Sequence, residues 1–271
     1  MTIPTAALWS PAVTAFIALA CGLIGLCVGS FLNVVIHRVP QRESVVRPRS
    51  KCPACDAPIA DRDNIPVLSW IMLRGRCRSC DAPISARYPA VELATAGLFV
   101  AAGIAFSHSW ALPAFCVFFA ALLAITVIDL DHFIIPNRVI YPTLFITAPL
   151  LLAAAALEGD WRPAEHAAIG GVAGFVAFFI VHLVSPRGMG FGDVRLAGVI
   201  GMMLGWLGLG FVALALFLSF LFASVIGIGL MVTRIRSRKD AVPFGPFMAA
   251  GALIAALWGR VIIDAYVRSR G

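Results

Sequence analysis

The feature that most constrains the fold is a series of long apolar runs. Several of them reach about 17–25 residues, which is enough for an α-helix to cross the hydrocarbon core of a bilayer. Eight spans are predicted: 12–36, 89–107, 111–128, 138–157, 166–184, 194–208, 209–232 and 245–264. The sixth is short and rich in glycine, so a single long bent span over 194–232 is an alternative. Only 13% of the residues are charged, about half the usual share in soluble domains, which predicts an all-α polytopic membrane protein.

The positive charges indicate how the chain lies in the membrane. Ten of the 21 Lys and Arg residues fall within 37–88, and with eight spans another seven share that face: Arg138, Arg187, Arg195, Arg234, Arg236, Arg238 and Lys239. The positive-inside rule makes this face cytoplasmic and leaves both termini outside. The excess positive charge is spread over separate membrane loops, so it favours a topology signal over binding of nucleic acid.

The one long polar stretch, 37–88, carries a metal-binding pattern. Cys52 and Cys55 form one Cys-x-x-Cys pair, and Cys77 and Cys80 form a second pair after 21 further residues. Each pair continues as Asp-Ala-Pro-Ile, which indicates an internal repeat. Two such turns can present four thiolates to one zinc ion, as in zinc ribbons. Disulfide or redox chemistry is the alternative, but a cytoplasmic loop is a reducing environment. The sequence therefore predicts structural Zn²⁺ here.

A few carboxylates lie at the ends of predicted spans. Asp129 and Asp131 end the third span, Asp193 begins the sixth, and Glu92 lies just inside the second. In the predicted topology all four are near the same membrane face. Acidic residues at membrane depth usually face a bundle interior or a water-filled cavity and serve function. Structural explanations also exist: Asp193 could cap its helix, and Asp129 could pair with a nearby Arg or His.

Two carboxylates from different helices would have a specific chemistry. Like charges a few ångströms apart share a proton, so one member is ionised while the other is protonated. The ionised member takes a proton from water, and the protonated member donates to a substrate carbonyl, which hydrolyses a peptide bond. Before Asp193, Gly188, Gly190 and Gly192 permit positive φ and close approach of a substrate backbone.

At this point the sequence closely resembles the bacterial type IV prepilin leader peptidases. These are bifunctional peptidase/N-methyltransferases of type IV pilus and type II secretion systems. The resemblance covers nearly the whole chain through the two CxxC pairs and these motifs: "GLCVGSFLNVVIHRVP" at 25–40, "DNIPVLSW" at 63–70, "ARYPAVELATA" at 86–96, "IDLDHFIIPN" at 128–137, "GMGFGD" at 188–193 and "VPFGPFMAAG" at 242–251.

The resemblance implies a membrane aspartic protease whose catalytic residues match Asp129 and Asp193. Asp131 is two residues from Asp129, so on a helix it faces about 200° away. The implied substrates are prepilins or pseudopilins in the bacterial inner membrane, cleaved at the cytoplasmic face after the Gly that ends a basic leader. The new N-terminal residue, usually Phe, is then methylated with S-adenosylmethionine. One departure is Asn137, where many relatives have Asp.

Two rival functions remain at this stage. A proton-coupled transporter would use intramembrane carboxylates, but such sites lie near the bilayer midplane. A membrane-anchored zinc-ribbon platform would leave Asp193 and its glycines unexplained. No soluble Rossmann pattern holds the methyl donor, so Glu92, Arg87 and the segment near Gly29 are candidates for that site.

The expected organisation has three parts. Residues 1–36 form the first transmembrane helix, 37–88 form a cytoplasmic zinc-binding loop domain, and 89–271 form a multi-helix membrane domain with the protease site.

Overall fold

The computed structural model describes residues 10–47, 49–186, 189–233 and 242–269. The chain forms two compact units, Met1–His108 and Ser109–Gly271, which are described separately. Within the described residues the regular structure is helical, and backbone pairing outside helices is limited to two isolated β-bridges. The cluster Arg234, Arg236, Arg238 and Lys239, together with Arg187, lies outside the described residues.

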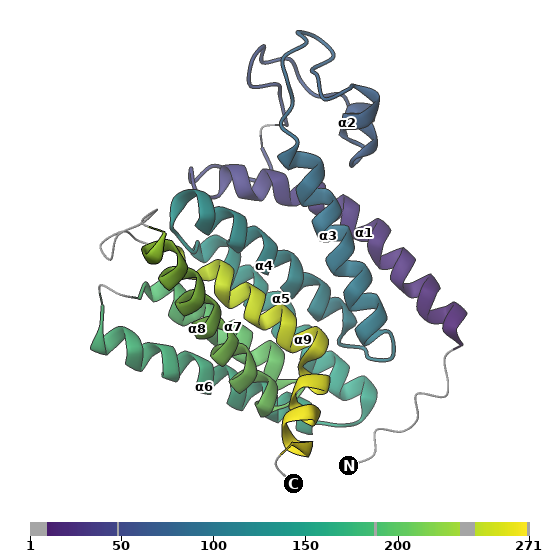
Figure 1. Cartoon of the computed structure of the whole chain (residues 1–271). Helices are drawn as coiled ribbons and strands as arrows, with labels where there is room; N and C mark the ends of the chain where they lie inside the picture. Colours follow the sequence, from purple (N-terminus) through teal and green to yellow (C-terminus); the bar gives the residue numbers. More distant parts are fainter. Residues whose placement is uncertain (1–9, 48, 187–188, 234–241, 270–271) are drawn as a thin grey trace. The chain divides into compact units, whose positions relative to one another are not determined.

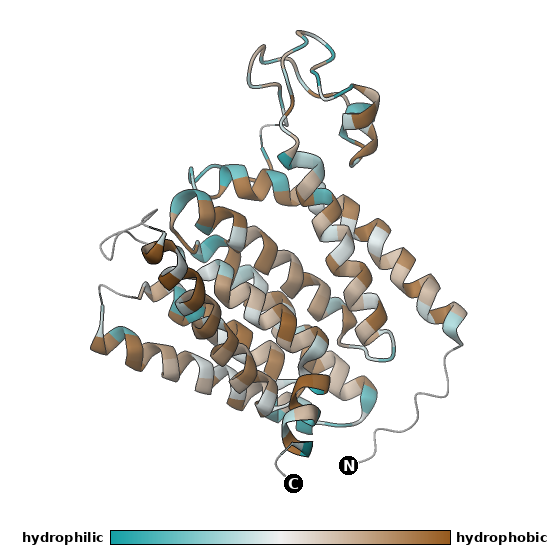
Figure 2. Ribbon diagram, viewed as in Figure 1, coloured by the Kyte–Doolittle hydropathy of each residue, from teal (hydrophilic) through white to brown (hydrophobic). Residues whose placement is uncertain are grey.

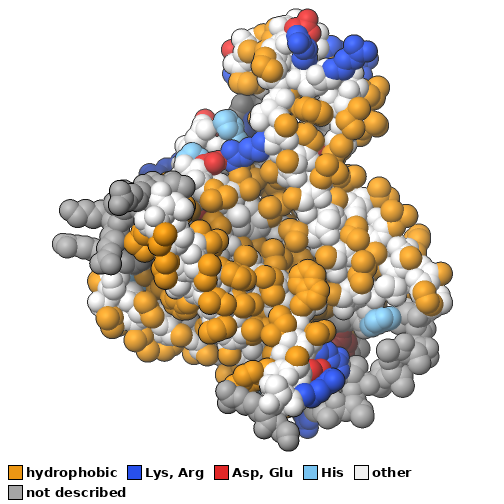
Figure 3. All heavy atoms as spheres, viewed as in Figure 1, with side chains coloured by type: hydrophobic (Ala, Val, Ile, Leu, Met, Phe, Trp, Pro, Cys, Tyr) orange, Lys and Arg blue, Asp and Glu red, His pale blue; other side chains and the backbone are white. Residues whose placement is uncertain are grey.

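Seven of the eight predicted spans are present as long apolar helices (Figure 1). Of the described helices, seven are long and apolar enough to cross a membrane: α1 (Pro11–Arg38), α3 (Arg87–Phe106), α4 (Leu112–His132), α5 (Asn137–Glu158), α6 (Arg162–Val184), α8 (Leu209–Val232) and α9 (Gly245–Arg268). Apolar residues predominate along these helices in Figure 2, and hydrophilic residues lie mainly near their ends. The large apolar side chains of Phe145, Phe217 and Val225 are more than half exposed, as lipid-facing residues would be. Figure 3 shows hydrophobic side chains over much of this face of the molecule.

The predicted sixth span is the short helix α7 (Phe191–Gly205), which has 15 residues. It is separate from α8, because the chain turns at Gly208, whose φ of 133° is reserved for glycine. The alternative of one long bent span is therefore wrong. Ten of the 15 residues of α7 are buried.

In the first unit, α1 and α3 pack through small residues. A Cβ atom on Gly25 or Gly29 would lie 2.8 or 2.7 Å from the Cα of Ala96 or Glu92. Only residues without side chains allow this spacing, which is a common way for helices to associate in membranes. The polar stretch between the two helices contains the 3₁₀ helix η1 (Asp61–Asn64) and the short helix α2 (Leu68–Met72).

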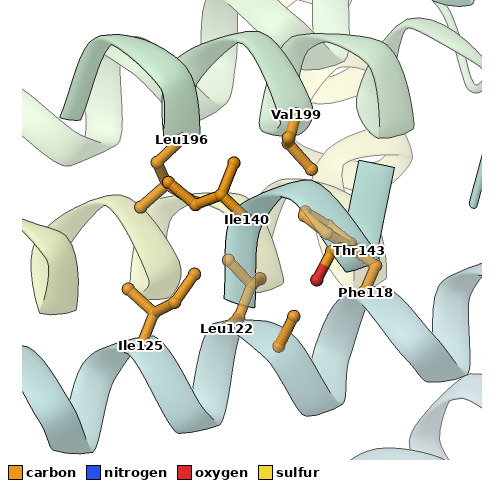
Figure 4. Close-up of a pocket in the computed structure, with 8 residues that line it drawn as sticks. Phe118, Leu122, Ile125, Ile140, Thr143, Leu196 and Val199 are labelled. Atoms are coloured by element: carbon orange, nitrogen blue, oxygen red, sulfur yellow. The ribbon is translucent and has the colours of Figure 1, made fainter. Parts of the chain in front are cut away.

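In the second unit, the core lies between α4, α5 and α7 (Figure 4). Phe118, Leu122 and Ile125 of α4 face side chains of α5 and α7 such as Ile140 and Leu196 around an apolar void of about 10 Å³. A void of this size and polarity remains dry. Ile125 precedes Asp129 by one helical turn, and Leu196 follows Asp193 by almost one. This core therefore fixes the ends of the two helices that carry the aspartates.

Helices α6 and α7 cross closely. A Cβ on Gly201 of α7 would lie 2.1 Å from the carbonyl oxygen of Gly170 of α6, and a Cβ on Gly174 would lie 2.5 Å from that of Ala197. These contacts hold α7 deep in the bundle. Helix packing divides the chain into two units at residue 108. The expected organisation into three functional parts, with boundaries at residues 36 and 88, stays a prediction.

Candidate active site and cysteine cluster

Asp129 lies in the last turn of α4. The helix ends because Phe133 adopts a left-handed conformation, with φ 56°, and its N–H donates to the carbonyl oxygen of Asp129 at 2.9 Å. The Asp129 side chain is only 4% exposed. Its Oδ2 atom accepts a hydrogen bond of 2.9 Å from the backbone N–H of Gly245, the first residue of α9. A carboxylate of α4 therefore caps another helix 116 residues further along the chain.

Asp193 lies in the first turn of α7 and is also buried. Its Oδ2 accepts a hydrogen bond of 3.1 Å from the backbone N–H of Gly190, so it does cap its own helix. Its carboxylate also interacts electrostatically with that of Asp129. The structure therefore brings the two predicted aspartates together, each at a helix end, whereas Asp131 is exposed. Their catalytic role stays a prediction.

Ile135 joins three segments around this pair. A Cβ on Gly192 would lie 2.9 Å from the Cβ of Ile135, and a Cβ on Gly245 would lie 3.4 Å from its Cδ1 atom. The loop after α4, the Gly-rich loop before α7 and the start of α9 therefore meet at one side chain. Of the three glycines singled out in the sequence, Gly188 lies outside the described residues.

A cavity opens beside Asp193. Its volume is about 210 Å³, and its lining is apolar except for Ser185 and the carboxylate; the residues are Val181, Ser185, Met189, Asp193, Phe220 and Phe244. The rings of Phe220 and Phe244 are 5.4 Å apart and both pack against Phe178. The aspartate is thus reachable from a mostly apolar space.

The departure at Asn137 has a structural role. Asn137 begins α5, and its Oδ1 atom accepts a hydrogen bond from the guanidinium of Arg195 in α7. Arg195 also lies over the ring of Phe191, 4.4 Å from its centroid. The side chain at position 137 therefore links α5 to α7 two residues beyond Asp193. An asparagine makes this link without adding a third negative charge.

Glu92 belongs to a different cluster, in the first unit. It is 7% exposed and accepts a hydrogen bond of 2.7 Å from the N–H of Val67 and another from the Ser30 side chain. Val67 has φ 61°, a strained conformation for a β-branched residue. Nearby, the Asn33 amide donates to the carbonyl of Tyr88 at 3.1 Å. Glu92 therefore fixes the polar loop against α1 and α3.

The four predicted metal ligands also come together. The Sγ atoms of Cys52, Cys55, Cys77 and Cys80 all lie within 4.8 Å of one another, and those of Cys52 and Cys80 are 3.9 Å apart. Four sulfurs around one zinc ion at about 2.3 Å would be about 3.8 Å apart. The donor set and its spacing thus fit a closed tetrahedral zinc site. The ion itself stays a prediction.

The two Cys pairs have the same backbone, as their sequence repeat predicts. The N–H of Cys52 donates to the carbonyl of Ala57, and the N–H of Cys77 donates to that of Ala82, both at 2.9 Å. In each copy the following Asp has a positive φ, 56° or 57°. Outside the cluster, Arg78 makes a two-pronged ion pair with Asp63 of η1, and this contact lowers the pKa of the Asp63 carboxyl.

The thiols do not ionise equally. Backbone N–H groups of Ala54 and Cys55, hydrogen-bonded to its sulfur, lower the pKa of the Cys52 thiol to about 7. For Cys80, the N–H of Ala82 lowers the pKa, but hydrogen bonds with the other thiols and burial outweigh it and raise the value to about 12. Four adjacent thiolates repel one another, so a divalent cation is what allows all four to ionise together.

Gly245 and Ile135 were not predicted as site residues. The sequence showed "VPFGPF" only as a shared motif, and its contact with Asp129 depends on helices that are distant along the chain. Glu92 was predicted to lie near the same membrane face as the aspartates and was a candidate for the methyl-donor site. Its hydrogen-bond partners, Val67 and Ser30, belong to the first unit.

Two family models match the chain. Residues 116–232 match the type IV leader peptidase family, and residues 23–106 match the bacterial peptidase A24 N-terminal domain. No solved structure matches the chain.

Three curated relatives are each called prepilin leader peptidase/N-methyltransferase. That of Aeromonas salmonicida strain A449 is 38% identical, covering 90% of this chain and 92% of the relative. That of Bacillus subtilis strain 168 is 36% identical, covering 91% and 96%, and that of Pseudomonas aeruginosa is 34% identical, covering 92% and 93%. The family match and this end-to-end similarity show that the chain belongs to the type IV leader peptidase family.

Proposed function

We propose that this protein is a membrane aspartic endopeptidase that removes the basic leader of type IV prepilins or pseudopilins and then methylates the new N-terminus. The observation that carries the proposal is the pair Asp129 and Asp193. Both are buried, they come from different helices, and their charges interact. The names of the similar proteins support the same pair of activities.

In the proposed hydrolysis the two carboxyl groups share one proton. The ionised carboxylate accepts a proton from a water molecule, whose oxygen attacks the scissile carbonyl carbon. The protonated carboxyl donates its proton to the carbonyl oxygen. The carboxyl that took the water proton then donates it to the amine nitrogen as the C–N bond breaks, and the other carboxylate takes a proton from a hydroxyl of the tetrahedral intermediate, which restores the shared proton. The mostly apolar cavity beside Asp193 offers a space from which a peptide segment can reach this carboxylate.

The active site is proposed to lie at the cytoplasmic face of the bacterial inner membrane. The helices support a multi-pass membrane protein, and the distribution of Lys and Arg supports the orientation. Both aspartates lie in a terminal turn of a helix, away from the midplane where transporter sites occur. The transporter alternative therefore has no structural support.

S-adenosylmethionine is proposed as the methyl donor. Its sulfonium group is positive, and the buried Glu92 carboxylate with Ser30 and Asn33 nearby offers a complementary negative charge in a polar setting. These residues would bind and orient the donor. Equilibrium binding of S-adenosylmethionine to Glu92→Gln tests this without measuring turnover: weaker binding supports the site, and unchanged binding rules it out.

The zinc ion is proposed to be structural. Four cysteine ligands fill a tetrahedral shell and leave no position for a reactive water. When bound, zinc would tie the two Cys-x-x-Cys turns together and so stabilise a loop with little core of its own.

The deciding experiment is an assay of the purified protein in lipid nanodiscs with a full-length prepilin, with and without S-adenosylmethionine. Mass spectrometry of the product separates cleavage from methylation. We expect a product that starts directly after the leader glycine, and a further mass increase of one methyl group only when the donor is present. An uncleaved prepilin would contradict the proposed peptidase.

A further inference from the structure

The N-terminus of α9 makes an unusual contact with the aspartate pair. An α-helix leaves its first backbone N–H groups without partners inside the helix. The residue before α9 is Phe244, which offers no side-chain cap. The N–H of Gly245 is instead satisfied by Asp129 Oδ2 at 2.9 Å, in a buried hydrogen bond between segments far apart in sequence.

A side chain at this position would displace the Asp129 carboxylate. A Cβ atom on residue 245 would lie 2.8 Å from Oδ2 and 3.3 Å from Cγ of Asp129. The first distance is far below an ordinary contact, and the atom in its way belongs to the proposed catalytic group. The backbone of Gly245 is helical, so the requirement arises from space near the carboxylate and not from a positive φ.

The two aspartates are held in matching ways. Asp129 Oδ2 accepts from the N–H of Gly245, and Asp193 Oδ2 accepts from the N–H of Gly190. A carboxylate with one oxygen fixed by an amide has a fixed orientation for the other oxygen. In a pair that shares a proton and one water molecule, that orientation determines whether the two Oδ1 atoms can act together.

We propose that Gly245 is a positioning residue of the peptidase: its N–H orients the Asp129 carboxylate, and its lack of a side chain leaves room for that orientation. This inference rests on the proposed function, since it assigns a role within the aspartic site. Among the described residues, Gly245 hydrogen-bonds one side chain, that of Asp129, at Oδ2. It acts through Asp129.

The test compares three glycine-to-alanine variants in nanodiscs. Gly245→Ala pushes on the carboxylate. Gly251→Ala, on the same helix, would place a Cβ 2.7 Å from the carbonyl oxygen of Ala215 in α8 and so disturbs packing only. Gly227→Ala has nothing within 4 Å of the added atom and is the neutral control. Cleavage of prepilin, methylation of a pre-cleaved pilin and the melting temperature are measured for each.

We expect Gly245→Ala to lower kcat for cleavage by about 100-fold or more, as displacement of a catalytic group by about an ångström does. KM, methylation and the melting temperature should stay near those of the parent. Gly251→Ala should lower the melting temperature and reduce both activities together, and Gly227→Ala should change nothing. Gly245→Ala with near-parental kcat, or with both activities falling as in Gly251→Ala, overturns the proposal.

A second variant separates positioning from misfolding. Ile135 Cδ1 lies 3.4 Å from the added Cβ, so Ile135→Val gives the start of α9 room to move away from the carboxylate. The double variant Gly245→Ala/Ile135→Val should recover a measurable part of the lost kcat. A double variant that folds but cleaves no faster than Gly245→Ala contradicts the positioning role. Asp129→Asn and Asp193→Asn test the aspartic mechanism separately, so failure of one hypothesis is distinguishable from failure of the other.

Discussion

The substitution Asp193→Asn separates the two roles of this residue. As a helix cap, Asp193 accepts a hydrogen bond of 3.1 Å from the N–H of Gly190. As a member of the proposed pair, it interacts with Asp129 and exchanges a proton. Asparagine keeps an acceptor oxygen in the same place, but it cannot hold or release a proton. The cap survives the change and the proposed chemistry does not.

The structure gives the expected size of each effect. Loss of a negative charge at a helix N-terminus costs about 0.3–1 kcal/mol. Removing a buried charge next to Asp129 offsets part of this cost, so the free energy of unfolding should change by about 1 kcal/mol or less. Losing one acid–base group should lower kcat for cleavage by about 10²–10⁴-fold. At the upper end this adds about 5 kcal/mol to the barrier, well above the effect on stability.

The measurements are the melting temperature, prepilin cleavage and methylation of a pre-cleaved pilin, all in the same nanodiscs. Asp131→Asn is the matched control, since Asp131 is exposed and two residues from Asp129; it should keep most of the cleavage activity. Asp193→Ala should add the loss of the cap, about 0.5–2 kcal/mol. Cleavage by Asp193→Asn near the parental rate would refute the proposed role. A variant in which cleavage, methylation and the melting temperature all fall together would refute it as well.

Three further outcomes are expected. Cys77→Ser should release zinc, seen by elemental analysis, and impair methylation and substrate handling more than hydrolysis; a fully active protein that never contained zinc would contradict the structural site. Arg195→Ala should lower the cleavage rate, because it removes the hydrogen bond that links α7 to α5. Asn137→Asp should keep this link as an ion pair and stay active. An Asn137→Asp variant that cleaves more slowly than Arg195→Ala would show that the link does not support cleavage. Glu92→Ala should leave the Val67 N–H without its acceptor at a local cost of about 1–3 kcal/mol, seen as faster hydrogen exchange in 65–73, and unchanged exchange would show that this contact does not hold the loop.

The membrane helices could be predicted from the sequence because the signal is local. Each helix satisfies its own backbone hydrogen bonds in lipid, so a long apolar run is enough to locate it. The predicted span 209–232 and the helix Leu209–Val232 agree end to end. The Cys-x-x-Cys turns are local too: the sequence indicated an internal repeat, and the structure shows the same backbone hydrogen bond in both copies.

The sequence also selected the aspartates, but its reasons were incomplete. Helical geometry placed Asp129 and Asp131 on different faces, and the resemblance favoured Asp129. The structure adds the physical distinction: Asp129 is buried against α9, and Asp131 is exposed. The position of Glu92 at a span end predicted its membrane face but not its neighbours, because residues at one face can belong to different helix pairs.

By itself, the sequence determined which segments are helices, which cysteines form a ligand set and which carboxylates lie at helix ends, since each depends on residues close together in the chain. Only the tertiary structure decided that Asp129 caps the start of α9, that Ile135 packs against Gly192 and Gly245, and that Asn137 binds Arg195. These contacts join segments up to 116 residues apart. They depend on how closely helices approach, and that distance is set by mutual packing of side chains, which no local pattern encodes.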